Sequence, residues 1–234
     1  MKNTRASIHL IAGGRGSNRR KGPDPLLAAV FQLAKVERPK IAYVGTASGD
    51  NSVFRLWIAK AFQKAGSGKV SLAPLCGKRA DVGKAKQALE NSDIVFVSGG
   101  DVEEGMRILE ERRMIEFLRA LYLEGKPFFG VSAGSIMLGR QWVRWKDPED
   151  NGSAELFPCL GFAPLCCDTH GEGDGWEELH ALQSLAPARS TSYGITSGAS
   201  LLVHQDGTLS ALGGEVHRFT GRGKSVRQIE SLVP

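Results

Sequence analysis

The chain has 234 residues, of which 41% are hydrophobic and 24% are charged. This balance is typical of a soluble α/β protein and excludes disordered and fibrous chains. The formal net charge of +5 is mild, and the basic cluster of Arg15, Arg19, Arg20 and Lys21 predicts a solvated loop rather than a nucleic-acid surface.

Apolar runs rich in β-branched residues alternate with segments of helical periodicity. In chain order, the predicted strands are 7–12, 40–44, 70–74, 93–98 and 128–131, and the predicted helices are 25–36, 52–65, 82–91 and 102–124. The helix 52–65 is expected to bury a stripe formed by Phe54, Ile58, Ala61, Phe62 and Ala65. The helix 102–124 is expected to break near Gly105 and in its charged middle.

After about residue 140 the pattern changes. Residues 146–153 predict a polar, acidic loop, and 176–185 predicts a helix. Three β-strands are expected at 201–203, 209–212 and 216–219, with Asp206-Gly207 as the turn between the first two.

Alternating strands and helices predict a three-layer α/β fold, in which a mostly parallel sheet has helices on both faces. Residues 1–234 are expected to form one domain, because no linker or repeat divides them. Such sheets gather functional groups at the carboxyl ends of their strands. The predicted strand ends are Gly13-Gly14, Gly45-Thr46, Gly99-Gly100 and Ser132, which we expect at one edge of the sheet.

The segment Met1–Arg5 lacks the apolar core of a signal peptide, and no run reaches the roughly 18 apolar residues of a membrane span. We therefore expect a cytoplasmic protein without a membrane partner. Its four cysteines, Cys76, Cys159, Cys166 and Cys167, are expected to be free thiols. No metal is expected, because Cys166 and Cys167 with His170 lack a second ligand pair of recognisable spacing.

The most informative motif is Gly130-Val131-Ser132-Ala133-Gly134. A serine between glycines, after a strand and before a helix, is typical of a nucleophile elbow. The tight turn lifts the hydroxyl out of the sheet, and the helix N-terminus offers free N–H groups to an oxyanion. The alternative is an ordinary glycine-rich turn.

A serine nucleophile needs a base, and His170 is the best candidate among the five histidines. It falls in a predicted loop, 168–173, beside glycines and straight after the apolar stretch 162–165, whereas His9 is expected in the core and His180 on a helix. His204 and His217 fall in the late β region, where a surface histidine is the default.

The base needs an orienting carboxylate. Asp147, Glu149 and Asp150 lie between Ser132 and His170, and the order serine, acid, histidine is one known arrangement. The alternative is that these three acids only solvate a surface loop. For the oxyanion, the predicted donors are the amides of Ala133 and of Gly99 or Gly100.

These motifs together resemble the peptidase E / cyanophycinase family of serine peptidases. The resemblance rests on Val97–Asp101, on Gly130–Ser135 and on Asp168-Thr169-His170, and it extends to Ile11–Gly14 and Tyr193–Thr196. It implies a fold like that of class I glutamine amidotransferases, without a cofactor. It also implies Ser132 as nucleophile, His170 as base and Asp147 as the acid, with Glu149 or Asp150 as alternatives, and a binding role for Gly99, Gly100 and Asp101.

The sequence thus predicts a serine hydrolase that cleaves a small peptide or isopeptide bond through an acyl-enzyme. The loop after His170 departs from the family, since Gly171–Glu178 is acidic where relatives carry an aromatic residue and arginines. An acidic loop beside the base favours a cationic substrate group. The alternative function is a catalytically altered or inactive ligand-binding member of the same fold. A homodimer is compatible with the sequence.

Two other functions are disfavoured. Nucleotide binding through Gly13-Gly14-Arg15-Gly16 lacks the last glycine of the dinucleotide fingerprint, where Arg19 stands. An ordinary α/β-hydrolase is disfavoured because His170 follows Ser132 closely and no lipase-type His-Gly-Gly loop occurs.

Overall fold

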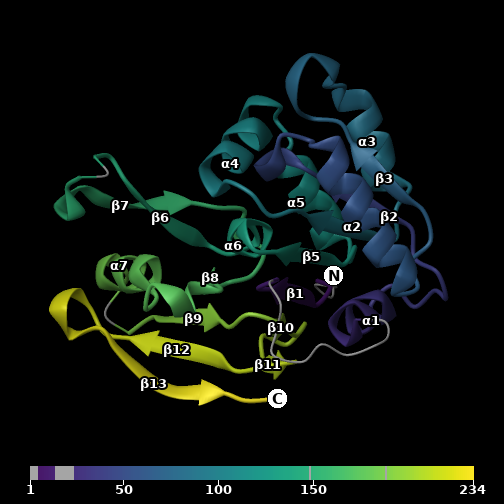
Figure 1. Ribbon diagram of the computed structural model, residues 1–234. Coiled ribbons are helices and arrows are strands. Elements are labelled where there is room, and N and C mark those ends of the chain that lie inside the picture. The colour runs from purple at the N-terminus through teal and green to yellow at the C-terminus, as the bar shows by residue number, and fades with distance from the viewer. Residues whose placement is uncertain (1–4, 14–23, 148, 188) are drawn as a thin grey trace.

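The computed structural model describes residues 5–13, 24–147, 149–187 and 189–234. Among these residues, the largest sheet has seven strands in the order β11-β10-β1-β5-β4-β2-β3 (Figure 1). Its members are β1 (Ile8–Ile11), β2 (Ile41–Val44), β3 (Val70–Ala73), β4 (Ile94–Val97), β5 (Phe128–Val131), β10 (Ser200–Val203) and β11 (Leu209–Leu212). Five neighbouring strands, β1, β5, β4, β2 and β3, run parallel to one another. Beyond β1, the sheet continues with β10 and β11, which pair antiparallel.

Helices cover both faces of this sheet. They are α1 (Pro25–Gln32), α2 (Ser52–Lys64), α3 (Val82–Glu90), α4 (Val102–Glu111), α5 (Ile115–Leu123) and α6 (Ala133–Leu138). Alternation along each strand divides the core, because successive side chains point to opposite faces. Ile41 and Tyr43 pack with α1 and α2, whereas Ala42 and Val44 belong to the cluster that includes α3 to α6. The predicted three-layer α/β fold is therefore confirmed.

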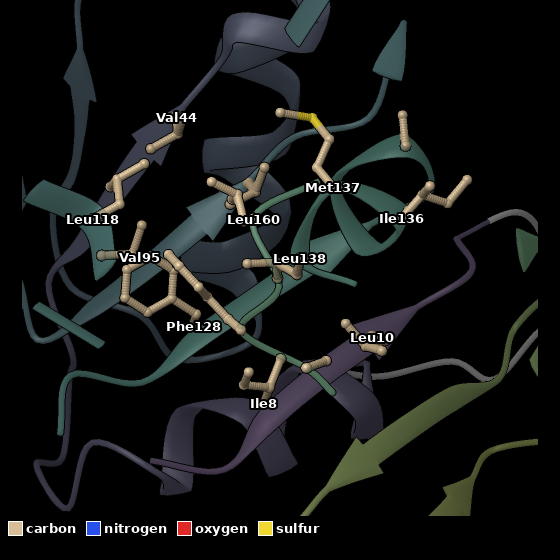
Figure 2. Packing of buried hydrophobic residues seen from close by; sticks show 14 of the residues in the cluster. Ile8, Leu10, Val44, Val95, Leu118, Phe128, Ile136, Met137, Leu138 and Leu160 are labelled. Atoms are coloured by element: carbon tan, nitrogen blue, oxygen red, sulfur yellow. The ribbon is translucent and has the colours of Figure 1, made fainter. Parts of the chain in front are cut away.

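The layer beneath α6 is a closely packed hydrophobic core. Figure 2 shows Ile136, Met137 and Leu138 of α6 together with Leu10, Val95 and Phe128 from the sheet. Met137 and Leu138 are fully buried, as is Phe128. This packing fixes α6, and therefore the residue that precedes it, against the carboxyl ends of β1 and β5.

Two smaller sheets complete the described structure. One has the order β13-β12-β9-β8, and the other is a hairpin of β6 and β7. Their strands are β6 (Gln141–Trp145), β7 (Ala154–Pro158), β8 (Cys166–Thr169), β9 (Thr191–Ile195), β12 (Val216–Thr220) and β13 (Arg227–Leu232). Helix α7 (Glu177–Leu185) contacts both of these sheets. No helix in the described ranges is long and apolar enough to cross a membrane.

Most predicted elements lie within a few residues of the observed ones, but two details are wrong. Phe54 is 36% exposed, so the buried stripe of α2 consists of Ile58 and Phe62. Gly105 lies inside α4 and does not break it. A β-carbon at Gly105 would lie 2.8 Å from the Met137 side chain, so this glycine permits close helix packing. The break between α4 and α5 lies instead near Arg113, where φ is 55°.

Candidate active site

Ser132 lies between β5 and α6 in a strained backbone conformation, with φ 54° and ψ −126°. A non-glycine residue rarely adopts a positive φ, and such strain is characteristic of functional turns. Its N–H donates to the carbonyl of Ile11 at 2.9 Å, which ties the turn to the end of β1. The turn directs the hydroxyl into a cleft of about 360 Å³.

The glycines around Ser132 are required by close contact. A β-carbon at Gly134 would lie 2.0 Å from the carbonyl oxygen of Val97, and one at Gly130 would lie 2.4 Å from the backbone of Gly134. Both contacts are with backbone atoms, which have no rotamer by which to move aside. Gly130 and Gly134 therefore allow α6 to start directly above β4 and β5.

His170 follows β8 and faces the serine. The Ser132 hydroxyl lies 2.8 Å from Nε2 of His170. With the hydroxyl donating to Nε2, the neutral imidazole carries its proton on Nδ1. The His170 N–H donates to the carbonyl of Ile195 at 2.9 Å, and its backbone is left-handed with φ 48°. The structure thus brings together the two residues that the sequence predicted as nucleophile and base.

The N–H groups predicted for the oxyanion lie at the same edge of the sheet. Among the described residues, those of Gly99, Gly100 and Ala133 have no hydrogen-bond acceptor. Gly99 is adjacent to the serine, since a β-carbon there would lie 3.1 Å from Ser132 Cβ. Gly100 and Ala133 line the cleft. Of the predicted strand ends, Gly14 lies outside the described residues.

Asp101 lines the same cleft and also stabilises α4. Its Oδ1 accepts a hydrogen bond from the N–H of Glu104 at 2.9 Å, as expected for an N-cap residue. Asp101 therefore has a structural role whether or not it contacts a ligand.

The three acids predicted as orienting groups lie elsewhere. Asp147, Glu149 and Asp150 belong to the loop between β6 and β7, at the outer tip of a hairpin that projects away from α6 (Figure 1). Asp147 Oδ1 accepts from the N–H of Glu149 at 3.0 Å, and Asp150 Oδ1 accepts from Gly152 at 2.8 Å. None of the three lines the cleft. Their part in a triad stays a prediction that gains no support from this geometry.

Other carboxylates surround the base. In the part of the chain that the structure describes, Nδ1 of His170 has no hydrogen-bond partner, and Asp168, Asp174 and Glu178 line the cleft beside it. Sequence reasoning passed over Asp168 because it stands two residues before His170. The signal that could have found it is a carboxylate in a buried strand, at the point where the strand ends.

Asp168 is a buried carboxyl with one unsatisfied oxygen. Only 5% of the residue is exposed, Oδ1 accepts from the N–H of Thr169 at 2.6 Å, and Oδ2 has no partner among the described residues. Burial raises the pKa of the carboxyl from its ordinary 3.8 to about 7. The Thr169 hydrogen bond opposes this rise, and the charges of Glu178, Asp174 and Glu172 add to it.

We expect Asp168→Asn to stabilise the protein more at pH 8 than at pH 5. Because the folded-state pKa lies above the unfolded one, the folded state binds the extra proton between about pH 4 and 7, and stability falls as pH rises through that window. At pH 8 the ionised carboxyl costs the fold at most about 4 kcal/mol, which asparagine removes. Urea unfolding at both pH values checks this.

The control is Glu177→Gln, because Glu177 is an exposed residue nearby on α7. This substitution should leave the free energy of unfolding unchanged at both pH 5 and pH 8. Equal effects of Asp168→Asn on the free energy of unfolding at pH 5 and pH 8 would contradict the prediction.

The described ranges contain no group of three or more His, Cys, Asp or Glu side chains arranged for a metal ion. The segment from Gly13 to Gly16, which the sequence analysis disfavoured for nucleotide binding, lies outside the described residues apart from Gly13.

Known proteins resemble this chain over most of its length. The model of peptidase family S51 matches residues 8–210. The chain is 24% identical over 194 residues to the uncharacterized peptidase YgaJ of Bacillus subtilis (strain 168), a match that covers 82% of this chain and 81% of that protein. It is 26% identical over 157 residues to the pyridoxal 5'-phosphate synthase subunit PdxT of Geobacillus sp. (strain WCH70), with 67% and 74% covered.

Two solved structures share the fold. A peptidase from an acI-B1 Actinobacterium superposes with a TM-score of 0.72 at 17% identity, over 99% of this chain and 98% of the other. A putative peptidase E protein from Listeria monocytogenes EGD-e gives a TM-score of 0.62 at 13% identity, over 89% and 98%. At these identities the likeness extends to the fold and not to the substrate.

Proposed function

Because the chain belongs to peptidase family S51, we propose that it is a serine peptidase that cleaves a small peptide or isopeptide bond through an acyl-enzyme on Ser132. The observation that carries this proposal is the 2.8 Å contact between Ser132 Oγ and His170 Nε2, two residues that line an open cleft. A hydroxyl becomes an effective nucleophile when a base accepts its proton, and this distance is within reach of that transfer.

In the proposed reaction, Ser132 Oγ attacks the carbonyl carbon of the scissile bond while its proton passes to Nε2 of His170. The negative oxygen of the tetrahedral intermediate accepts hydrogen bonds from the N–H of Ala133 and from Gly99 or Gly100. His170 then protonates the leaving amine, and the C–N bond breaks to give an ester on Ser132. Water, activated by the same imidazole, hydrolyses the ester and restores the serine.

The imidazolium that forms in each step is stabilised by negative charge. Asp168, Asp174 and Glu178 line the cleft with His170 and can supply it, whereas Asp147 lies in the hairpin loop. We therefore rank these three carboxylates above Asp147, Glu149 and Asp150 for this role.

A fluorophosphonate probe tests the proposal. We expect one probe molecule to attach to the wild-type protein at Ser132, as read by peptide mass spectrometry, because only an activated serine attacks it quickly. His170→Asn should slow the labelling by about 100-fold or more through loss of the base. His180→Asn, on the exposed side of α7, serves as the matched control and should label at the wild-type rate.

Absence of labelling in a folded wild-type protein would favour the second candidate, a ligand-binding protein without catalysis. The departure of Gly171–Glu178 from the family pattern is the observation that motivates that candidate.

A further inference from the structure

The cleft beside Ser132 is strongly acidic. Five carboxyl side chains and no lysine or arginine occur among the described residues that line it: Asp101, Glu103, Asp168, Asp174 and Glu178. Glu103 is compensated by Arg144, whose guanidinium lies 3.5 Å away. The other four form no ion pair with a described residue within 4.0 Å.

An acidic lining alone has an ordinary explanation as a solvated surface, but Asp168 does not fit that explanation. It is 95% buried, since its exposed fraction is 5%, and its Oδ2 has no hydrogen-bond partner in the described structure. A buried carboxylate is normally paired or fully hydrogen-bonded, because an uncompensated buried charge is costly. Asp168 therefore lacks, among the described residues, the positive partner that its ionised form requires.

The apolar residues of the cleft further restrict the kind of ligand that it can bind. Trp142 of β6 and Ile136 of α6 line it together with the carboxylates. A long cationic side chain suits such a surface, because its aliphatic stem packs on apolar groups and aromatic faces while its charged head reaches the acids.

We propose that this cleft selects peptides that carry a cationic side chain, arginine or lysine, next to the scissile bond, with Asp168, Asp174 and Glu178 providing the negative charge. The proposal deepens the proposed function and rests on it. Electrostatic complementarity of this kind governs specificity and the rate of association.

Arginine and citrulline provide a matched pair for the test, because they have nearly the same shape and differ in charge. Dipeptides with either residue on each side of the scissile bond are compared by kcat/KM. We expect the best arginine peptide to exceed its citrulline partner by about 10-fold or more, and the ratio to shrink as salt rises from about 0.02 M to about 0.5 M.

Two variants assign the preference to the cleft. Glu178→Gln with Asp174→Asn should lower the arginine-to-citrulline ratio by about 3-fold or more. Glu177→Gln, which removes a neighbouring exposed charge outside the cleft, should leave the ratio unchanged. If the carboxylates only stabilised the imidazolium, both substrates would slow equally and the ratio would stay constant, which would overturn the proposal.

A binding measurement keeps the test independent of catalysis. Argininamide and citrullinamide are titrated into Ser132→Ala protein by calorimetry, and argininamide should bind about 10-fold more tightly. Equal binding, or tighter binding of citrullinamide, would overturn the substrate class. Failure of fluorophosphonate to label the wild-type protein would instead overturn the peptidase assignment, so the two failures are distinguishable.

Discussion

Ser132→Ala is expected to lower kcat for peptide hydrolysis by about 10⁴-fold or more while the protein stays folded. Ser132 supplies the atom that forms the acyl-enzyme, and no other described hydroxyl lies within hydrogen-bond distance of the His170 ring. Ser132→Gly should lose as much activity. Steady-state kinetics on the best dipeptide, with circular dichroism as the check on folding, give the comparison.

The two variants should differ in stability. At φ 54° and ψ −126°, a β-carbon is strained and glycine is not, so Ser132→Gly should be about 1 kcal/mol more stable than Ser132→Ala. Urea unfolding measures the difference. Full activity in Ser132→Ala would contradict the assignment of Ser132 as the nucleophile. A glycine variant less stable than the alanine variant would contradict the claim that the backbone at this position is strained.

Gly134→Ala is expected to destabilise the protein by about 3 kcal/mol or more, or to prevent soluble expression. The new methyl group would lie 2.0 Å from the carbonyl oxygen of Val97 and 2.6 Å from its carbonyl carbon. To relieve these contacts, α6 must move away from β4, and its large buried side chains Ile136, Met137 and Leu138 must leave their packing. Urea unfolding gives the free energy, and expression level reports an outright failure to fold.

Gly173→Ala is the control, because a β-carbon at Gly173 would meet no described heavy atom within 4 Å and its φ is not positive. It should change the free energy of unfolding by less than about 0.5 kcal/mol. If Gly134→Ala lowered the free energy of unfolding as little as Gly173→Ala does, the inferred close contact between α6 and β4 would be wrong.

The parallel half of the fold could be predicted because its strands are continuous buried runs. Ile41–Val44 and Ile94–Val97 have no exposed residue, so their sequences are uniformly apolar and bounded by turns. Two of the strands that the sequence analysis did not find, β6 and β13, are only partly buried and carry charges. Arg227–Leu232 has three exposed residues, and Gln141–Trp145 has a single buried one, so neither shows a clear period of two.

The site was predictable to the extent that local shape determines it. A serine between glycines at a strand end requires a tight turn, and His170 stands beside glycines after an apolar stretch, where a loop histidine is a good candidate for a base. The acid was not predictable in this way, because the order of residues along the chain does not fix which loop returns to the site. Residues 141–158 form a hairpin that carries Asp147 outward, while the end of β8 carries Asp168 into the cleft.

Ser132 and His170 belong to different sheets, since the serine follows β5 of the seven-stranded sheet and the histidine follows β8 of the four-stranded one in the described chain. The contact between α6 and β8, where the Cys167 thiol donates to the carbonyl of Ser135 at 3.7 Å, sets the separation of the two reacting groups. Over evolutionary time, substitutions at this buried contact between α6 and β8 can therefore change the reactivity of Ser132 without changing any atom that faces the substrate.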